Sequence, residues 1–181
     1  MSRSEATVDT SELIHFLKAR SLKLVTAESC TAGLIASSIA DVEGAGDLLE
    51  CAFVAYSPAA KERCLGVRPE TIARFNLTSE AVAREMAEGA LRGSCASLAI
   101  SNTGVTDDVD PDIPAGTQCY GWAFRDGDRS PVVFSETRQF DGDRNEIRRR
   151  SADYALARIP HWHALFEARH GAPTGSNAAS A

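Results

Sequence analysis

The sequence predicts an α/β fold, a three-layer α/β/α sandwich with a mixed sheet. Apolar runs alternate with helical segments in the first half of the chain, Asp126-Gly127 gives a late hairpin signal, and 181 residues fit one domain. Alternating strands and helices are typical of parallel strands covered on both faces, whereas a hairpin joins antiparallel strands. These patterns leave the strand order open.

The chain begins with a helix, a strand and a second helix. Apolar residues at helical spacing follow a polar entry, which predicts a capped helix over about residues 10–20. The apolar run 22–27 is rich in Leu and Val and predicts a buried strand. The polar residues 28–31 come directly afterwards, and we expect them to open a helix that runs to about Ala40.

The middle of the chain repeats this alternation. A second strand is expected over residues 50–56, and Pro58 then begins a helix at a position where a missing N–H is tolerated. Ser79 caps a long helix whose apolar residues share one face. Another buried strand follows at residues 96–100.

Two strands and a helix complete the fold. The strands are expected at residues 116–124 and 131–140, and a final helix at 144–158. We expect a single domain over residues 10–168, because the end segments 1–9 and 169–181 lack apolar periodicity. Both end segments are therefore expected to be flexible.

Composition excludes several functional classes. The net charge of -6 argues against a nucleic-acid partner, and no apolar run is long enough to span a membrane. The start of the chain lacks a signal-peptide pattern, which favours a cytoplasmic location. The cysteines are odd in number and scattered, so we expect reduced thiols rather than a disulfide framework or a zinc site; they are Cys30, Cys51, Cys64, Cys95 and Cys119.

A polar cluster at residues 26–33 lies where a strand is expected to meet a helix. Ligands of open α/β sheets bind at such strand ends, and helix N–H groups there can hold an anion. Ser29 is therefore a candidate nucleophile, with the alternative that it only caps the helix. Its neighbour Cys30 is a rival nucleophile that we expect to point into the helix packing instead.

A serine nucleophile needs a base, and lysine is the better candidate. The four histidines lie in the terminal helices, away from the strand ends; they are His15, His161, His163 and His170. Lys61 follows a strand end, and a desolvated ammonium can lose its proton whereas a guanidinium cannot. We expect Lys61 within hydrogen-bond reach of Ser29, directly or through a water or Tyr56. The alternatives are a solvated lysine and a half-buried core tyrosine.

Motifs along the chain resemble the CinA C-terminal domain family. They cover about residues 10–158 and include residues 27–33, 56–57, 60–61, 65–67, 78–83, 103–105, 114–117 and 140–144. The resemblance implies a three-layer α/β/α fold, a homodimer, and nicotinamide mononucleotide amidohydrolase activity in pyridine nucleotide salvage. This reaction releases ammonia and needs neither a cofactor nor a metal.

The resemblance also implies roles for individual residues. Ser29 matches the nucleophile, Lys61 its general base and Tyr56 a third catalytic member. Residues expected to bind the small-molecule nucleotide substrate are Thr31, Gly33, Thr103, Gly104 and Arg148. An arginine on a charged helix is more often solvated, so Arg148 has that alternative.

Two departures from the family pattern affect the expected activity. Ala32 replaces a glycine, and Thr106-Asp107-Asp108 replaces the neutral Ala-Gly-Pro. Carboxylates facing the pocket would repel a phosphate, so we expect weak hydrolysis that improves when Ala-Gly-Pro is restored. Facing solvent, they would do little, and a cation site in this acidic run is a further alternative. The competing function is an inactive domain that binds a nucleotide or a protein.

Overall fold

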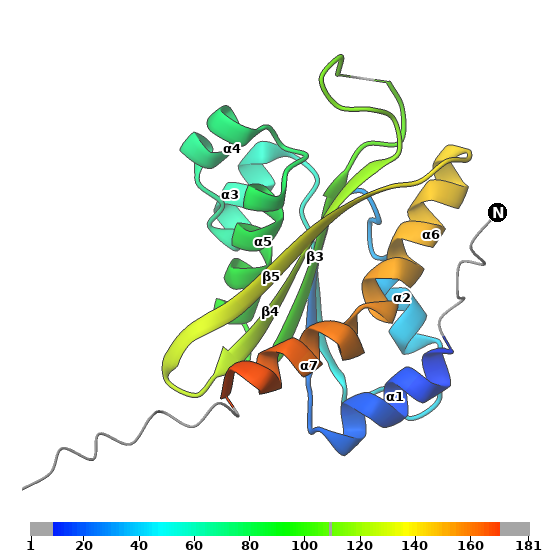
Figure 1. Ribbon diagram of the computed structural model, residues 1–181, viewed down its shortest axis with the longest axis vertical. Helices are drawn as coiled ribbons and strands as arrows, with labels where there is room; N and C mark the ends of the chain where they lie inside the picture. Colours follow the sequence, from blue (N-terminus) through cyan, green and yellow to red (C-terminus); the bar gives the residue numbers. More distant parts are fainter. Residues whose placement is uncertain (1–8, 109, 171–181) are drawn as a thin grey trace, which may run out of the picture.

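The sheet lies between two layers of helices, as predicted (Figure 1). The computed structural model describes residues 9–108 and 110–170. The described strands lie in the order β2-β1-β3-β4-β5, with the bounds β1 Leu24–Glu28, β2 Leu49–Val54, β3 Leu98–Gly104, β4 Thr117–Asp126 and β5 Arg129–Gln139. The helices are α1 Thr10–Ala19, α2 Leu34–Ala40, α3 Pro58–Leu65, α4 Pro69–Phe75, α5 Glu80–Arg92, α6 Arg144–Ala157 and α7 Ile159–His170.

The sheet is mixed, which confirms the prediction. Strand β1 pairs in parallel with β2 and β3, whereas β4 is antiparallel to both β3 and β5. The carboxyl ends of the three parallel strands therefore meet at one edge of the sheet. There Glu28, the last residue of β1, lies opposite Val54 of β2 and Asn102 of β3. This edge carries the candidate site.

Each face of the sheet has its own apolar core. Helices α1, α2, α6 and α7 cover one face, and α3, α4 and α5 lie on the other (Figure 1). Side chains of a strand point alternately to the two faces, so Leu24 belongs to the first core and Val25 to the second. All five residues of β1 are buried, because the strand is covered on both faces and paired on both sides.

Local signals in the sequence explain most of the element ends. The Asp9 carboxylate caps α1 by accepting from two backbone N–H groups, and the Ser79 hydroxyl caps α5 by accepting from the Val82 N–H. Pro58 is the first residue of α3, as predicted. The hairpin between β4 and β5 turns at residues 126–129, where Gly127 has a φ of 55° that favours glycine.

Helices α4 and α7 were not predicted. Helix α4 begins at Pro69 with Glu70 in its first turn, a helix-start pattern that the sequence contains. The expected last helix ends one residue early, at Ala157, and α7 then continues the chain to His170. Residues 169–170 are thus helical rather than part of a flexible tail. The other residues of the two expected flexible segments, apart from the α1 cap Asp9, lie outside the described residues.

The helix after β1 starts later than predicted. Residues 29–33 form a turn, and α2 begins only at Leu34. The reason is local conformation: Ala32 has a φ of 49° and Gly33 a φ of 96°, and neither fits a right-handed helix. A left-handed alanine costs about 1 kcal/mol, so other contacts must hold this turn.

None of the described helices is long and apolar enough to cross a membrane. The five cysteines are free thiols, as expected.

Candidate active site

Ser29 and Lys61 meet at the carboxyl edge of the parallel strands. Ser29 is the first residue after β1, and its N–H donates to the carbonyl of Asn102 at 3.0 Å. Lys61 lies in the first turn of α3, which follows β2 after a short connection. The Lys61 Nζ is 2.8 Å from the Ser29 Oγ, so the expected direct contact is confirmed. Lys61 is 1% exposed and is therefore not the solvated lysine of the alternative interpretation.

The surroundings of Lys61 suit a neutral amine. Its Nζ is also 2.9 Å from the carbonyl oxygen of Ala55 and 3.1 Å from that of Tyr56. The three oxygens can accept the three hydrogens of an ammonium; once one proton is lost, the two carbonyls can accept the remaining two hydrogens while the lone pair faces the Ser29 hydroxyl. Burial lowers the pKa of Lys61 from 10.5 to about 8, although the nearby Cys30 raises it slightly. A base with this pKa can accept a proton near neutral pH.

The Glu28 carboxylate fills the N-terminus of α2. Glu28 is fully buried and accepts from the N–H groups of Gly33, Ile35 and Ala36 and from the Thr31 hydroxyl, at 2.7–3.1 Å. The prediction that helix N–H groups here hold the anion of a ligand is therefore wrong for these three groups. The protein's own carboxylate takes that place.

Three of the residues expected to bind substrate also hold the turn at residues 29–33. The polar groups of Thr31 and the N–H of Gly33 bond to Glu28 and Asn102. Arg148 donates to the carbonyls of Cys30 at 2.9 Å and Thr31 at 3.2 Å. These contacts give Thr31, Gly33 and Arg148 a role in holding residues 29–33, and their expected contacts with a substrate stay predictions. Arg148 is half-buried rather than solvated.

Thr103 and Gly104 do lie in the cavity beside Ser29. The cavity has a volume of about 280 Å³, and its lining comprises Ser29, Tyr56, Lys61, Asn76, Leu77, Thr78, Thr103, Gly104, Val105, Asp110 and Ile113. The hydroxyl of Thr103 donates to the carbonyl of Leu77 at 2.9 Å. A Cβ at Gly104 would come within 2.3 Å of the Gln118 side chain, which explains the glycine there.

Tyr56 and Cys30 differ in their access to this cavity. Tyr56 lines the cavity with its ring 56% exposed, so it is not a core residue, and its hydroxyl accepts from Arg144 at 3.1 Å. Cys30 is 4% exposed, with its Sγ 3.4 Å from the Gln118 Nε2, and burial raises the pKa of its thiol. Ser29 lines the cavity, as predicted, and Cys30 does not; the Cys30 thiol contacts Gln118 of β4 rather than the helix packing that was expected.

Sequence reasoning missed Asn102 and Gln118 behind the turn. Asn102 is fully buried, and its Oδ1 accepts from the Thr31 N–H at 3.1 Å. Its Nδ2 donates to Gln118 at 3.0 Å and to Ser151 at 3.2 Å. A buried amide in this network is fixed in orientation. Their sequence signal is weak, because each lies beside other polar residues of its strand, Ser101 and Thr103 in β3 and Thr117 in β4.

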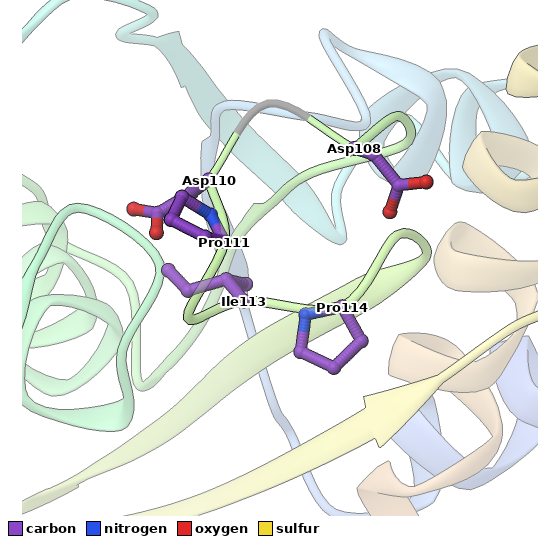
Figure 2. A pocket seen from close by; sticks show the side chains of 5 residues that line it. All are labelled: Asp108, Asp110, Pro111, Ile113 and Pro114. Carbon is purple, nitrogen blue, oxygen red and sulfur yellow. The ribbon is translucent and has the colours of Figure 1, made fainter.

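The altered loop between β3 and β4 places its carboxylates in three different surroundings. Asp107 pairs with Arg144 at 2.9 Å and accepts from Thr106 at 2.8 Å. Asp108 lines a neighbouring cavity of about 400 Å³ (Figure 2). Asp110 lines this neighbouring cavity too, with its carboxylate pointing away from Asp108 in Figure 2, and it also lines the cavity of Ser29 and Lys61. The described residues contain no group of three or more histidine, cysteine or acidic side chains that could hold a metal ion.

The fold and this edge define an α/β protein with a buried serine–lysine pair at the ends of its parallel strands. The family model of the CinA C-terminal domain matches residues 7–162. The chain belongs to this family, as its motifs indicated.

Relatives and solved structures agree with this assignment. The chain is 43% identical over 144 residues to a CinA-like protein of Chlorobium phaeobacteroides, covering 78% of this chain but only 34% of that protein. It is 38% identical over 158 residues to the nicotinamide-nucleotide amidohydrolase PncC of Shigella flexneri, covering 86% of this chain and 93% of that protein. The crystal structure of a CinA superfamily protein from Escherichia coli has a TM-score of 0.80 at 30% identity, covering 90% and 94% of the two chains.

Proposed function

We propose that this protein is an amidohydrolase that uses Ser29 and Lys61 on a nicotinamide mononucleotide-like substrate. The observation that carries the proposal is the 2.8 Å contact between Ser29 Oγ and Lys61 Nζ, with two carbonyls that can accept the amine hydrogens. Relatives named nicotinamide-nucleotide amidohydrolase support the substrate class. By the same resemblance we propose one catalytic domain over residues 10–168, a homodimer and a cytoplasmic location.

The reaction needs one nucleophile and one base that can return its proton. Lys61 takes the hydroxyl proton as Ser29 Oγ attacks the amide carbon, and gives it to the departing nitrogen, which leaves as ammonia. This leaves an ester on Ser29. A water, deprotonated by Lys61, then attacks the ester carbon, and the proton returns to Ser29 as the carboxylate product leaves. Tyr56 contributes its carbonyl to hold Lys61, and its exposed ring forms a wall of the cavity.

The test is ammonia release from nicotinamide mononucleotide. We expect Ser29→Ala to lower the rate by about 10³-fold or more, because the chemistry loses its nucleophile. Ser37→Ala is the matched control, since Ser37 is an exposed serine on α2. A Ser29→Ala protein as fast as the native protein would refute the proposal. Substrate binding without ammonia release by the native protein would favour the competing function, an inactive binding domain.

We also propose that hydrolysis of a phosphorylated substrate is weak, because the Asp107 carboxylate is paired with the Arg144 guanidinium at the edge of the cavity. Arg144 contacts the Tyr56 hydroxyl and is paired with Asp107. Both charged side chains are more than half exposed, so the pair is worth about 1 kcal/mol at most. A substrate phosphate would compete with the Asp107 carboxylate for the same guanidinium.

Asp107→Asn is therefore expected to improve binding of the phosphorylated substrate. We expect the KM for nicotinamide mononucleotide to fall by up to about fivefold at low salt. The change should be smaller for nicotinamide riboside, which lacks the phosphate. The effect should shrink as ionic strength rises. Asp108→Asn is the control, because Asp108 lines the neighbouring cavity. Equal changes for both substrates would show that Asp107 does not act on the phosphate.

A further inference from the structure

One carboxylate, that of Asp110, lines the cavity that contains Ser29 and Lys61. Among the described residues that line it, Lys61 and Asp110 carry the charged side chains. Lys61 points its amine at Ser29 and two carbonyls, as described above. Asp110 comes from the loop that differs from the family pattern, is half-buried, and lines both this cavity and the neighbouring one. The wall of the cavity on this side is therefore acidic.

The Asp110 carboxylate is fixed by neutral donors. Its Oδ2 accepts from the Asn76 Nδ2 at 2.6 Å, and its Oδ1 accepts from the Asp112 N–H at 2.9 Å. Within residues 9–108 and 110–170, no lysine or arginine forms an ion pair with it. The charge of Asp110 is thus held in place without being neutralised.

Asn76, which orients Asp110, has an uncommon backbone conformation. Its φ is 69° and its ψ is 162°, a region that residues other than glycine seldom adopt. The Asn76 Oδ1 also accepts from the Leu77 N–H at 2.5 Å, so the side chain braces its own turn. Strain of this kind persists where the surroundings impose it and is frequent at binding sites. Asn76 and Asp110 therefore form a rigid polar pair in the cavity wall.

A cationic ring fits this arrangement. A pyridine ring that is alkylated on nitrogen carries a positive charge, and a nearby carboxylate stabilises it in a partly desolvated cavity. Leu77 and Ile113 line the same cavity and offer apolar contacts to the faces or edge of such a ring. The reactive amide would then reach Ser29, which lines the same cavity.

We propose that Asp110 is a specificity-determining residue that selects amides attached to a positively charged heteroaromatic ring. This inference rests on the proposed function for the amide chemistry and adds the charge of the ring as the feature that is recognised. It predicts a preference over uncharged aromatic amides of the same shape.

The test compares two ligands without a phosphate: nicotinamide riboside, which is cationic, and benzamide riboside, its uncharged carbon-linked isostere. Binding is measured by calorimetry in the Ser29→Ala protein, which keeps the cationic ligand intact. We expect adding Asp110→Asn to weaken nicotinamide riboside binding about five- to tenfold at low salt and to leave benzamide riboside unchanged. Asp110→Glu keeps the charge and should retain part of the preference.

Asp112→Asn is the matched control, because Asp112 is an exposed carboxylate in the same loop and does not line the cavity. It should change neither dissociation constant. Equal weakening of both ligands by Asp110→Asn, no weakening of either, or no measurable binding of nicotinamide riboside would overturn the inference. Ammonia release by the native protein is measured separately, so that the two proposals can be distinguished. If the native protein releases ammonia but Asp110→Asn does not change ligand binding, only this inference is refuted. If binding depends on the charge of the ring but the native protein releases no ammonia, only the proposed hydrolase activity is refuted.

Discussion

Lys61→Met is expected to abolish amide hydrolysis and to change how the stability of the protein depends on pH. The loss of activity should be about 10³-fold or more, because methionine fills a similar space and cannot accept the Ser29 proton. In the native protein the rate should rise with pH and level off above about 8, where the ammonium of Lys61 has lost its proton. A rate independent of pH between 6 and 9 would contradict the role of Lys61 as base.

The effect on stability follows from the same lowered pKa. Lys61 has a pKa of about 8 in the folded protein and 10.5 as a free side chain, so between these values the unfolded chain binds more protons. The free energy of unfolding should therefore rise with pH over this window, by about 3 kcal/mol in total. Below pH 8 the penalty for burying the charge is fully present. Lys61→Met should lack this rise.

Urea unfolding of the two proteins between pH 7 and 10.5 measures the difference, and other titrating groups cancel in the comparison. Lys18→Met is the matched control, because Lys18 is exposed on α1 and its removal should leave the native pH dependence intact. Parallel stability curves for the native and Lys61→Met proteins would show that the amine is not desolvated. Only the pH dependence is compared, because removing the Lys61 amine also leaves the carbonyls of Ala55 and Tyr56 without a donor and so changes the stability at every pH.

The fold and the central pair could be predicted because they depend on local patterns and on one rule of sheet geometry. Apolar runs and caps located the strands and most of the helices. Ser29 and Lys61 each follow the end of a strand, and the ends of parallel strands meet at one edge. Their direct contact depends in addition on β1 and β2 being neighbours in the sheet, which the sequence leaves open.

The supporting residues could not be predicted, because their contacts depend on strand order and loop path. Gln118 reaches Asn102 only because β4 lies antiparallel to β3, a pairing with no local signal. The loop sequence likewise shows several carboxylates, but only the folded loop separates Asp107, which pairs with Arg144, from Asp110, which lines the cavity. Comparison with the family pattern shows that this loop differs, but it does not show which way the loop's carboxylates point.

Glu28 explains why the N-terminus of α2 does not hold the anion of a ligand that the sequence pattern predicts. A strand followed by polar residues and a helix is typical of an anion-binding site, whether the anion is a ligand or a side chain of the same protein. The two cases share one sequence pattern. Here the anion is the buried carboxylate of Glu28, which satisfies the first N–H groups of α2 and leaves Ser29 at the surface of the cavity.

Glu28→Ala is accordingly expected to be among the most destabilising single substitutions in this protein. The carboxylate is fully buried, and its loss leaves three backbone N–H groups and the Thr31 hydroxyl without their acceptor. Breaking a buried charged network of this kind costs about 3–5 kcal/mol, which lowers the Tm of a chain this long by about 10 °C. Differential scanning calorimetry measures the shift.

The turn that carries Ser29 should lose its geometry at the same time, because Ala32 is held in a left-handed conformation against its own preference. We therefore expect Glu28→Ala to lose hydrolysis even at temperatures where it is folded, and Glu28→Gln to lie between it and the native protein, since an amide keeps one acceptor. Glu43→Ala is the control, because Glu43 is exposed and its loss should change stability by about 0.5 kcal/mol or less. A Glu28→Ala protein with native Tm and native turnover would show that the turn is held by its other contacts, those of Asn102 and Arg148, without the carboxylate.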